Sequence, residues 1–393
     1  MGESPWDGFL VSPTVHRQWQ KQVAKLKDQP GYAESFAPNG RAPMPGERFQ
    51  CPGQAQTLAS IASSKGESFY RGELAQSILA HSRNTGGFFT EDDLSGHTAD
   101  WVDPIGMRYR DYELLEIGPN GQGIGALMAL GMLNQFDMVG QQRDSARYMH
   151  LQIEAMKLAF ADMYEYVGDS GHMNVSSAQL LDPAYLADRA RLIDPQRCSA
   201  HRHGLPHSGG TVYMTAADKD GTMISLIQSN FKGFGSGVVV PGTGIALHNR
   251  GWGFSTRPGH ANVVAPGKRP FHTIIPGFLM KNGTPHMSFG LMGGSMQAQG
   301  HVQIVSRLAD FGQNPQAASD APRWRVQDDN IGVAVEWNTA SEVIDQLRRY
   351  GHPVTVAPRF NLEFGSAQMA MRMEQGGYLA ASDHRKDGYA LGF

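Results

Sequence analysis

The stretch His207-Ser-Gly-Gly-Thr-Val-Tyr-Met-Thr-Ala-Ala-Asp-Lys-Asp-Gly221 joins a polar segment to a strand-like run, and its most informative feature is the dipeptide Gly210-Thr211. A threonine here gains a chemical use if the bond before it breaks, because the new α-amine can act as base for the hydroxyl of the same residue. Gly-Gly-Thr is also a common turn leading into a strand. The rest of the chain must decide between these two interpretations.

Composition indicates a soluble globular protein with one large or two ordinary domains. The chain has 393 residues, 40% of them hydrophobic, and a net charge of −3, which gives no argument for binding nucleic acid or an anionic membrane. No secretion signal and no 18-residue apolar run is visible, so the compartment stays open between cytoplasm and, if a stretch precedes this one, periplasm. Cys51 and Cys198 suggest neither a disulfide framework nor a zinc ribbon, and leave a single bridge open.

Helical periodicity dominates before the Gly-Thr junction. Apolar residues recur at helical spacing in four stretches, which predict helices over residues 13–27, 54–64, 71–85 and 145–166. Residues 197–210 are rich in turn formers and predict an exposed connector. Its histidines, His201, His203 and His207, lack carboxylate or cysteine partners, so we predict no metal site and no cofactor.

After the junction the apolar period changes to two. Residues 211–217 and 222–230 alternate about Asp218-Lys-Asp-Gly221, which predicts a hairpin, and a second hairpin is predicted around Pro241-Gly-Thr-Gly244. A strand near 285–291 precedes Gly293-Gly294 and a helix over 297–311. Strand pairs with tight turns and intervening helices favour an α+β protein with stacked antiparallel sheets over a doubly wound parallel sheet.

Three glycine-containing motifs have competing interpretations. Gly118-Pro-Asn-Gly-Gln-Gly-Ile-Gly125 follows a strand-like run as a dinucleotide loop would, but no second strand ending in an acidic residue follows, so a close-packed turn is favoured. Gly168-Asp-Ser-Gly171 matches a serine-protease tetrapeptide without the accompanying histidine segment, and predicts a turn. Gly293-Gly294-Ser295 lacks the spacing of a serine nucleophile, and its backbone N–H groups are better suited to holding an oxyanion.

No acidic residue occurs between Asp220 and Asp310, although seven basic residues do: Lys232, Arg250, Arg257, Lys268, Arg269, Lys281 and Arg307. One interpretation is a neutral, strand-rich core with basic loops. The other is a pocket for an anionic part of a substrate, in which an arginine would pair with a carboxylate.

The order of several motifs resembles the γ-glutamyltranspeptidase family of N-terminal nucleophile hydrolases. The start of its small subunit is similar to the stretch from Thr211 to Gly221. The other similar segments, from both subunits and nearly the whole chain, are Phe69-Tyr-Arg-Gly72, Gly86-Gly-Phe-Phe-Thr-Glu-Asp-Asp-Leu94, Pro119-Asn-Gly-Gln-Gly123, Glu154-Ala-Met-Lys-Leu-Ala-Phe-Ala-Asp162, Phe234-Gly-Ser-Gly237, Gly267-Lys-Arg-Pro270, Gly293-Gly-Ser295 and Asp320-Ala-Pro-Arg323.

The resemblance implies a four-layer αββα sandwich and a precursor that cuts itself between Gly210 and Thr211. Residues 1–210 would be the large-subunit portion and 211–393 the small-subunit portion, together forming one domain whose fragments stay associated. The implied activity is that of a γ-glutamyltransferase or glutathione hydrolase-like acylase, acting on a small-molecule amide with water or an amine as acceptor. By the same resemblance, Gly293 and Gly294 supply the oxyanion donors, and Ser229 lies near the nucleophile.

The chain departs from the γ-glutamyl pattern at the substrate positions. His272-Thr273 replaces a serine pair that binds the substrate α-carboxylate, and Asn249-Arg250-Gly-Trp-Gly253 lacks the aspartates that bind the α-ammonium group. We therefore expect a substrate with an anionic acyl group and no free α-amine, as in the cephalosporin acylase-like branch. Asn249, Arg250, His272 and Thr273 are the predicted substrate-binding residues, with Ser229 beside them.

The family has a substantial stretch before the segment that matches Asp7–Pro13, and the resemblance therefore implies a sandwich that is incomplete at the N-terminus. Lost strands would leave unpaired sheet edges and exposed apolar faces, which favour association. The alternative to an enzyme is thus a non-catalytic remnant or binding module.

Overall fold

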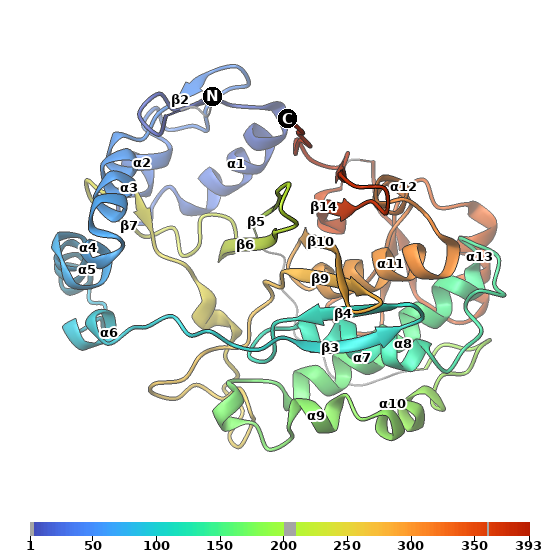
Figure 1. The fold of residues 1–393 in the computed structure, drawn as a ribbon. Coiled ribbons are helices and arrows are strands. Elements are labelled where there is room, and N and C mark those ends of the chain that lie inside the picture. Colours follow the sequence, from blue (N-terminus) through green and yellow to red (C-terminus); the bar gives the residue numbers. More distant parts are fainter. Residues whose placement is uncertain (1–3, 200–209, 360) are drawn as a thin grey trace. The chain divides into compact units, whose positions relative to one another are not determined.

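The computed structural model describes residues 4–199, 210–359 and 361–393, and it divides into two compact units (Figure 1). The first contains Met1–Trp101 and Asn230–Asn249, and the second contains Val102–Ser229 and Arg250–Phe393. Each unit is considered by itself. The three histidines of the predicted connector, His201, His203 and His207, lie outside the described residues.

The first unit is mainly helical. Helix α1 begins where Ser12 caps it, because the Ser12 hydroxyl accepts the Val15 N–H at 3.1 Å. The predicted helix over 71–85 is interrupted at Gly72, which separates α4 from α5. The elements are β1 (Phe9–Leu10), α1 (Pro13–Leu26), α2 (Tyr32–Phe36), β2 (Arg48–Phe49), α3 (Pro52–Ser64), α4 (Glu67–Arg71), α5 (Glu73–Asn84), α6 (Glu91–Ser95), β7 (Val239–Val240) and β8 (Ile245–Ala246).

A six-stranded sheet in the order β15-β14-β10-β9-β4-β3 is the centre of the second unit. Its neighbouring strands are all antiparallel, so the predicted preference for antiparallel over parallel sheets is confirmed. The strands are β3 (Ile105–Tyr109), β4 (Tyr112–Glu116), β9 (Gly277–Lys281), β10 (Thr284–Met292), β14 (Ser366–Arg372) and β15 (Tyr378–Ser382).

Two long helices cover one face of this sheet, α7 (Gly123–Leu133) and α11 (Met296–Phe311), and a third, α8 (Ala146–Tyr166), packs against them (Figure 1). Every residue of α7 is buried, and the methionine and aromatic stripe of α8 lies in the core as expected. Helix α8 also buries polar side chains, His150 and Glu154 among them. The shorter helical elements are η1 (Ser170–His172), α9 (Ser177–Leu180), α10 (Pro183–Ala190), η2 (Arg250–Gly253), α12 (Pro315–Asp320), α13 (Ser341–Arg349) and η3 (Leu362–Phe364).

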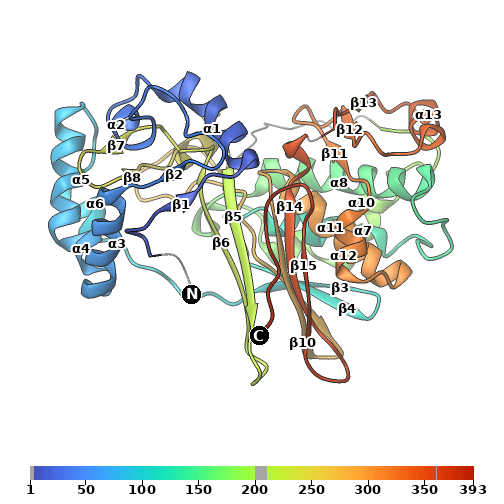
Figure 2. The same ribbon diagram turned by 90° about the horizontal axis from the view of Figure 1, so that it is seen from above.

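The predicted hairpin of β5 (Gly210–Ala217) and β6 (Met223–Phe231) is present and runs alongside β10 and β14 (Figure 2). The Tyr213 ring lies over Gly290, where a Cβ would overlap it, and the Tyr213 hydroxyl bonds to that of Ser225 at 2.7 Å. The opposite face of the hairpin is exposed and apolar. Its side chains are Val212, Met214, Ile224 and Leu226.

The competing interpretations of the glycine motifs are resolved in favour of turns. Strand β4 pairs antiparallel with both β3 and β9, so the glycines after it do not belong to a parallel dinucleotide-binding unit. They allow α7 to pack closely, since a Cβ on Gly123 would lie 2.7 Å from the Glu116 side chain. Gly168-Asp-Ser-Gly171 forms a turn into η1, in which Asp169 accepts the Gly171 N–H.

A small sheet of β11 (Trp324–Val326), β12 (Val333–Val335) and β13 (Val354–Val356) completes the second unit. Among the helices of the described residues, none combines the length and the apolar character that crossing a membrane requires. The junction at Gly210-Thr211 lies inside the second unit. The predicted portions 1–210 and 211–393 are therefore not the two compact units of the fold. They are the fragments that cleavage would produce, and this division stays a prediction.

Candidate active site

Thr211 lies at the start of β5, and its side chain is buried. Its hydroxyl donates to the hydroxyl of Ser229 on β6, with an Oγ–Oγ distance of 3.3 Å. The hairpin turn at Asp218–Gly221 sets this pairing, because it brings the first residues of β5 opposite the last residues of β6. The structure thus brings together two of the predicted site residues.

The contacts between β5 and β10 show where Thr211 lies along the larger sheet. Thr215 bonds through its hydroxyl to that of Ser288, and Tyr213 lies over Gly290. Moving two residues back along β5 thus moves two residues forward along β10. Continued by one more step, this alternation points Thr211 towards Met292, the last residue of β10, directly before Gly293.

Gly293 and Gly294 form the turn between β10 and α11, and their backbone conformation suits glycine alone. Their φ angles are 129° and 63°, a region that side chains with a Cβ rarely occupy. A Cβ on Gly293 would also lie 3.1 Å from the Cα of Gly365. The turn precedes the N-terminus of a 16-residue helix, where the helix dipole favours negative charge.

Gln122 fixes this turn to the predicted substrate-binding segment. Its side-chain amide nitrogen donates to the carbonyl oxygen of Gly294 at 2.8 Å and to that of Thr273 at 2.5 Å. Gln122 is fully buried. One amide therefore satisfies two buried carbonyl groups from segments far apart in sequence.

His272 and Thr273 lie on a segment that packs against the loop before α7. The backbone of His272 accepts a hydrogen bond from the Gln122 N–H and donates one to the Asn120 carbonyl, both at 3.1 Å. Burial, together with the nearby Arg250 charge, lowers the pKa of His272 to about 4, so the ring is neutral at neutral pH. Its Nδ1 atom is buried and accepts no hydrogen bond from the described residues.

Arg250 opens the short helix η2, which packs beside this segment. Asn262 joins the two, because its side chain donates to the Gly253 carbonyl at 2.6 Å and accepts the Phe271 N–H at 2.9 Å. Burial lowers the pKa of Arg250 to about 10, and the guanidinium stays charged at neutral pH. Asn262 therefore holds the end of η2, whose first residue is the charged Arg250, to the residue before the neutral His272.

The remaining predicted residues are placed differently. Asn249 belongs to the first unit, where its side-chain oxygen accepts the Lys232 N–H at 3.1 Å. Several basic residues of the acid-free stretch pair with acids from outside it, among them Arg257 with Glu165 and Arg307 with Asp144. The stretch is therefore not uniformly directed at one pocket, and Arg250 is its member that lies beside the predicted site residue His272.

Sequence reasoning missed Gln122 and Asn262 as organisers of the site. Gln122 lies in a glycine-rich stretch that predicts a close-packed turn and no site role, and Asn262 belongs to no motif. Both act through backbone groups of distant segments, which no spacing in the sequence reveals. The available signal was the position of Gln122 within Pro119-Asn-Gly-Gln-Gly123, one of the segments that carried the family resemblance.

Comparison with known proteins gives consistent matches along the chain. A family model described as gamma-glutamyltranspeptidase matches residues 5–393. The chain is 34% identical to the glutathione hydrolase-like YwrD proenzyme of Bacillus subtilis and to the oxamate amidohydrolase proenzyme of Klebsiella pneumoniae. Each match spans 98% of this chain and 74% of the relative. It is 31% identical to an acylase ACY 1 proenzyme of a Pseudomonas species, covering 90% of this chain and 63% of that protein.

A solved structure is similar to this chain over nearly its whole length. The crystal structure of a cephalosporin acylase from Bacillus halodurans matches with a TM-score of 0.90 and 46% identity, over 97% of this chain and 71% of the other. The predicted α+β sandwich of the N-terminal nucleophile hydrolase type is thereby confirmed.

Proposed function

We propose that Thr211 is the nucleophile of this chain, which belongs to the γ-glutamyltranspeptidase family and is an amidohydrolase or acyltransferase. We also propose that the chain cuts itself before this residue. The observation that carries the proposal is the position of Thr211. Its buried hydroxyl bonds to Ser229 on β6. The contacts of Thr215 and Tyr213 with β10 point Thr211 towards the end of that strand, which the Gly293-Gly294 turn follows. This arrangement supports a site in which Thr211 is the nucleophile, Ser229 is a neighbouring hydroxyl on the paired strand β6, and the turn after β10 holds the oxyanion.

Self-cleavage follows from ordinary acyl-transfer chemistry. The Thr211 oxygen attacks the carbonyl carbon of Gly210, and the C–N bond breaks as the hydroxyl proton passes to the departing nitrogen. An ester between Gly210 and the Thr211 oxygen then replaces the amide. Water then hydrolyses the ester, which releases the Gly210 carboxylate and leaves a free α-amine on Thr211. The names of the relatives, all proenzymes, support such processing. We propose that the two fragments stay associated afterwards.

Turnover of a substrate uses the same oxygen. The α-amine of Thr211, whose pKa in unfolded chains is about 7.7–8.0, takes the hydroxyl proton as the oxygen adds to the substrate carbonyl. The backbone of Gly293 and Gly294 would stabilise the negative charge on the carbonyl oxygen. The amine of the substrate leaves with the proton, an acyl-enzyme ester remains, and water or another amine accepts the acyl group.

We propose that the acyl group is anionic and carries no α-amine. The charged Arg250 beside the neutral His272 suits a carboxylate, and no acidic side chain lies in the sequence from Thr222 to Ala309 to balance an ammonium group. Two relatives point the same way, since one is an oxamate amidohydrolase and another a cephalosporin acylase. Oxamate is the monoamide of a dicarboxylic acid and has no amino-bearing carbon.

Self-cleavage is tested by denaturing electrophoresis with intact-mass measurement. We expect two pieces, one ending at Gly210 and one starting at Thr211, and a single uncut chain for Thr211→Ala. Thr211→Ser keeps a hydroxyl and an α-amine and should still cleave. A wild-type chain that stays whole, indistinguishable from Thr211→Ala, would support the alternative of a non-catalytic binding module.

Substrate preference is tested by comparing kcat/KM for glutaryl and γ-glutamyl anilides, which differ by the α-amine. We expect the glutaryl compound to be preferred, and Arg250→Met to reduce that preference by raising KM for the anionic acyl group. A clear preference for the γ-glutamyl compound would contradict the proposal for the substrate and leave the proposal for the nucleophile intact.

A further inference from the structure

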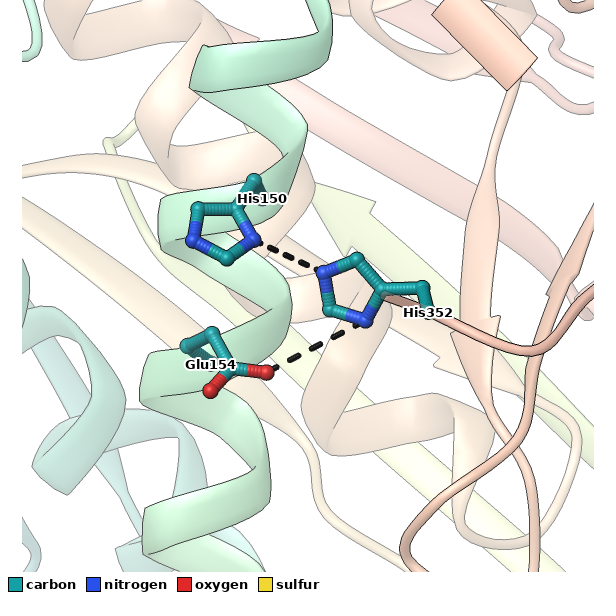
Figure 3. Close-up of side chains that lie close together, drawn as sticks. All are labelled: His150, Glu154 and His352. Carbon is teal, nitrogen blue, oxygen red and sulfur yellow. Dashed lines mark hydrogen bonds and ion pairs between the residues drawn. The ribbon is translucent and has the colours of Figure 1, made fainter. Parts of the chain in front are cut away.

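A buried polar cluster lies away from the candidate active site, where α8 meets the residues that follow α13. His150 and Glu154 project from α8, one helical turn apart, towards His352 (Figure 3). All three are buried, and Lys157 on the same helix is buried beside them. A set of two histidines, a carboxylate and a lysine in a protein core needs a physical explanation.

The hydrogen bonds assign the tautomer of each histidine. His150 Nε2 lies 2.8 Å from the Asp194 carbonyl oxygen, which can only accept, so His150 carries its proton on Nε2. Its Nδ1 atom must then accept from His352 Nε2, at 2.7 Å. His352 Nδ1 is left as an acceptor, and the Lys157 ammonium group donates to it at 3.3 Å.

The chain of bonds ends on a charge pair. Lys157 Nζ lies 3.2 Å from Glu154 Oε1, and Glu154 Oε2 accepts the Ser199 N–H at 2.9 Å. Both histidines are neutral, and one ammonium group balances one carboxylate. Three side chains with metal-ligating atoms lie within 4.8 Å of one another here, but the hydrogen bonds use the facing lone pairs of both histidines, and Lys157 supplies the positive charge.

The cluster holds the chain just before the connector. Asp194 is bound through its carbonyl group and Ser199 through its N–H, and between them the Cys198 N–H donates to the Tyr350 carbonyl at 2.7 Å. Residues 194–199 precede the Gly210–Thr211 bond, whereas Tyr350 and His352 follow it in sequence. The bonds therefore run between the two portions that cleavage would separate.

We propose that His150, Glu154, Lys157 and His352 form a clasp that positions residues 194–199 for self-cleavage and ties the two fragments together once the bond is cut. The proposal rests on the self-cleavage proposed above. The four are positioning residues, since they act through the backbone of residues 194–199. Ten residues separate Ser199 from Gly210, so fixing Ser199 reduces the conformational freedom of the chain that delivers the scissile bond.

Two clasp variants and one matched control test the proposal. His352→Leu removes the central link, and Lys157→Met removes the charge at similar volume. Gln152→Leu is the control, because Gln152 lies on the same helix and bonds to Trp324 and Ser306, at 3.0 and 2.6 Å, without contacting residues 194–199 through these bonds. All three variants disturb buried contacts between the two portions, but only the first two disturb the clasp.

Two readouts are needed, one independent of cleavage. In a Thr211→Ala background, hydrogen exchange of the Cys198 and Ser199 amides should become at least about tenfold faster in both clasp variants and stay near wild type in the control. With Thr211 present, self-cleavage should slow by at least about tenfold in the clasp variants. The control should cleave within about threefold of the wild-type rate, even if its unfolding temperature falls by as much as that of the clasp variants.

Three results would overturn the clasp: unchanged exchange at Cys198 and Ser199 in both clasp variants, cleavage rates that follow unfolding temperature equally in all three variants, or a stoichiometric rise in unfolding temperature with Zn²⁺ that His352→Leu abolishes. The last would indicate a metal site instead. If the wild-type chain does not cleave at all, self-processing is wrong, and the exchange experiment alone then decides whether the clasp holds residues 194–199.

Discussion

The hydroxyl of Ser229 accepts the hydrogen bond from Thr211 and thereby orients the proposed nucleophile. Ser229→Ala should lower kcat/KM by about two- to tenfold, because a neutral hydrogen bond contributes about 0.5–1.5 kcal/mol. The rate should be measured on fully cleaved protein, so that a defect in processing is not counted as a defect in turnover. Ser225→Ala, which removes a hydroxyl four residues earlier on the same strand, serves as the control. An equal loss in both variants would mean that Ser229 has no special role.

The pH dependence of turnover should follow the Thr211 amine and not His272. Burial holds the pKa of His272 at about 4, so this ring does not titrate between pH 5 and 8. An α-amine with a pKa of about 7.7–8.0 must lose its proton to act as base, so kcat/KM should rise with pH through that region. His272→Gln should leave the position of this rise unchanged. If the rise of kcat/KM occurs at a different pH in His272→Gln, the imidazole is the titrating base.

Gln122 connects two elements, the turn before α11 and the segment of Thr273, through one side chain. Gln122→Leu leaves two buried carbonyl groups without their donor, at a cost of about 1–3 kcal/mol for each group. We expect kcat to fall by about ten- to a hundredfold with a smaller change in KM, because the oxyanion turn loses its support.

The matched control for Gln122 is Gln303→Leu. Gln303 is also buried, and it bonds the backbone of Trp324 on β11, away from the turn. Both variants should be less stable in denaturant unfolding, but only Gln122→Leu should lose kcat. Similar losses of kcat in the two would assign Gln122 a purely structural role.

Elements with a regular pattern could be predicted, and those defined by contacts could not. The stripe from Met149 to Met163 predicted α8, and Asp218–Gly221 predicted the β5–β6 hairpin. The edge strand β3 was missed, because it contains a glycine and an arginine; among the described strands β4 is its one partner. The family resemblance predicted that Ser229 lies near Thr211, and the β5–β6 hairpin brings the two together. The link through Gln122 depends on tertiary packing and had no such signal.

For the whole molecule, the neutral buried histidines predict a loss of stability in mild acid. Burial and the Lys157 charge lower the pKa of His352 to about 3, although Glu154 opposes this, and burial also lowers the pKa of His150. The unfolded chain, with histidines near pKa 6.5, then binds more protons than the folded chain below this pH. The stabilisation is complete above about pH 6.5 and is lost as the pH falls towards 3.

The size of this effect is set by linkage. His352 alone changes the free energy of unfolding by at most about 1.4 kcal/mol per pH unit within that window. Urea unfolding at pH 7 and pH 5 should therefore show the difference between wild type and His352→Leu becoming smaller at the lower pH. A difference that is equal at both pH values would mean that His352 does not stay neutral in the folded protein.

The Tyr213 ring occupies the space above Gly290 that a side chain would otherwise fill. The residues at these two positions should therefore covary in size: where a relative has a larger residue at position 290, its residue at position 213 should be smaller. In a double-mutant cycle, Gly290→Ala should be severely destabilising beside tyrosine and nearly harmless beside Tyr213→Ala, so that the second change compensates for the first.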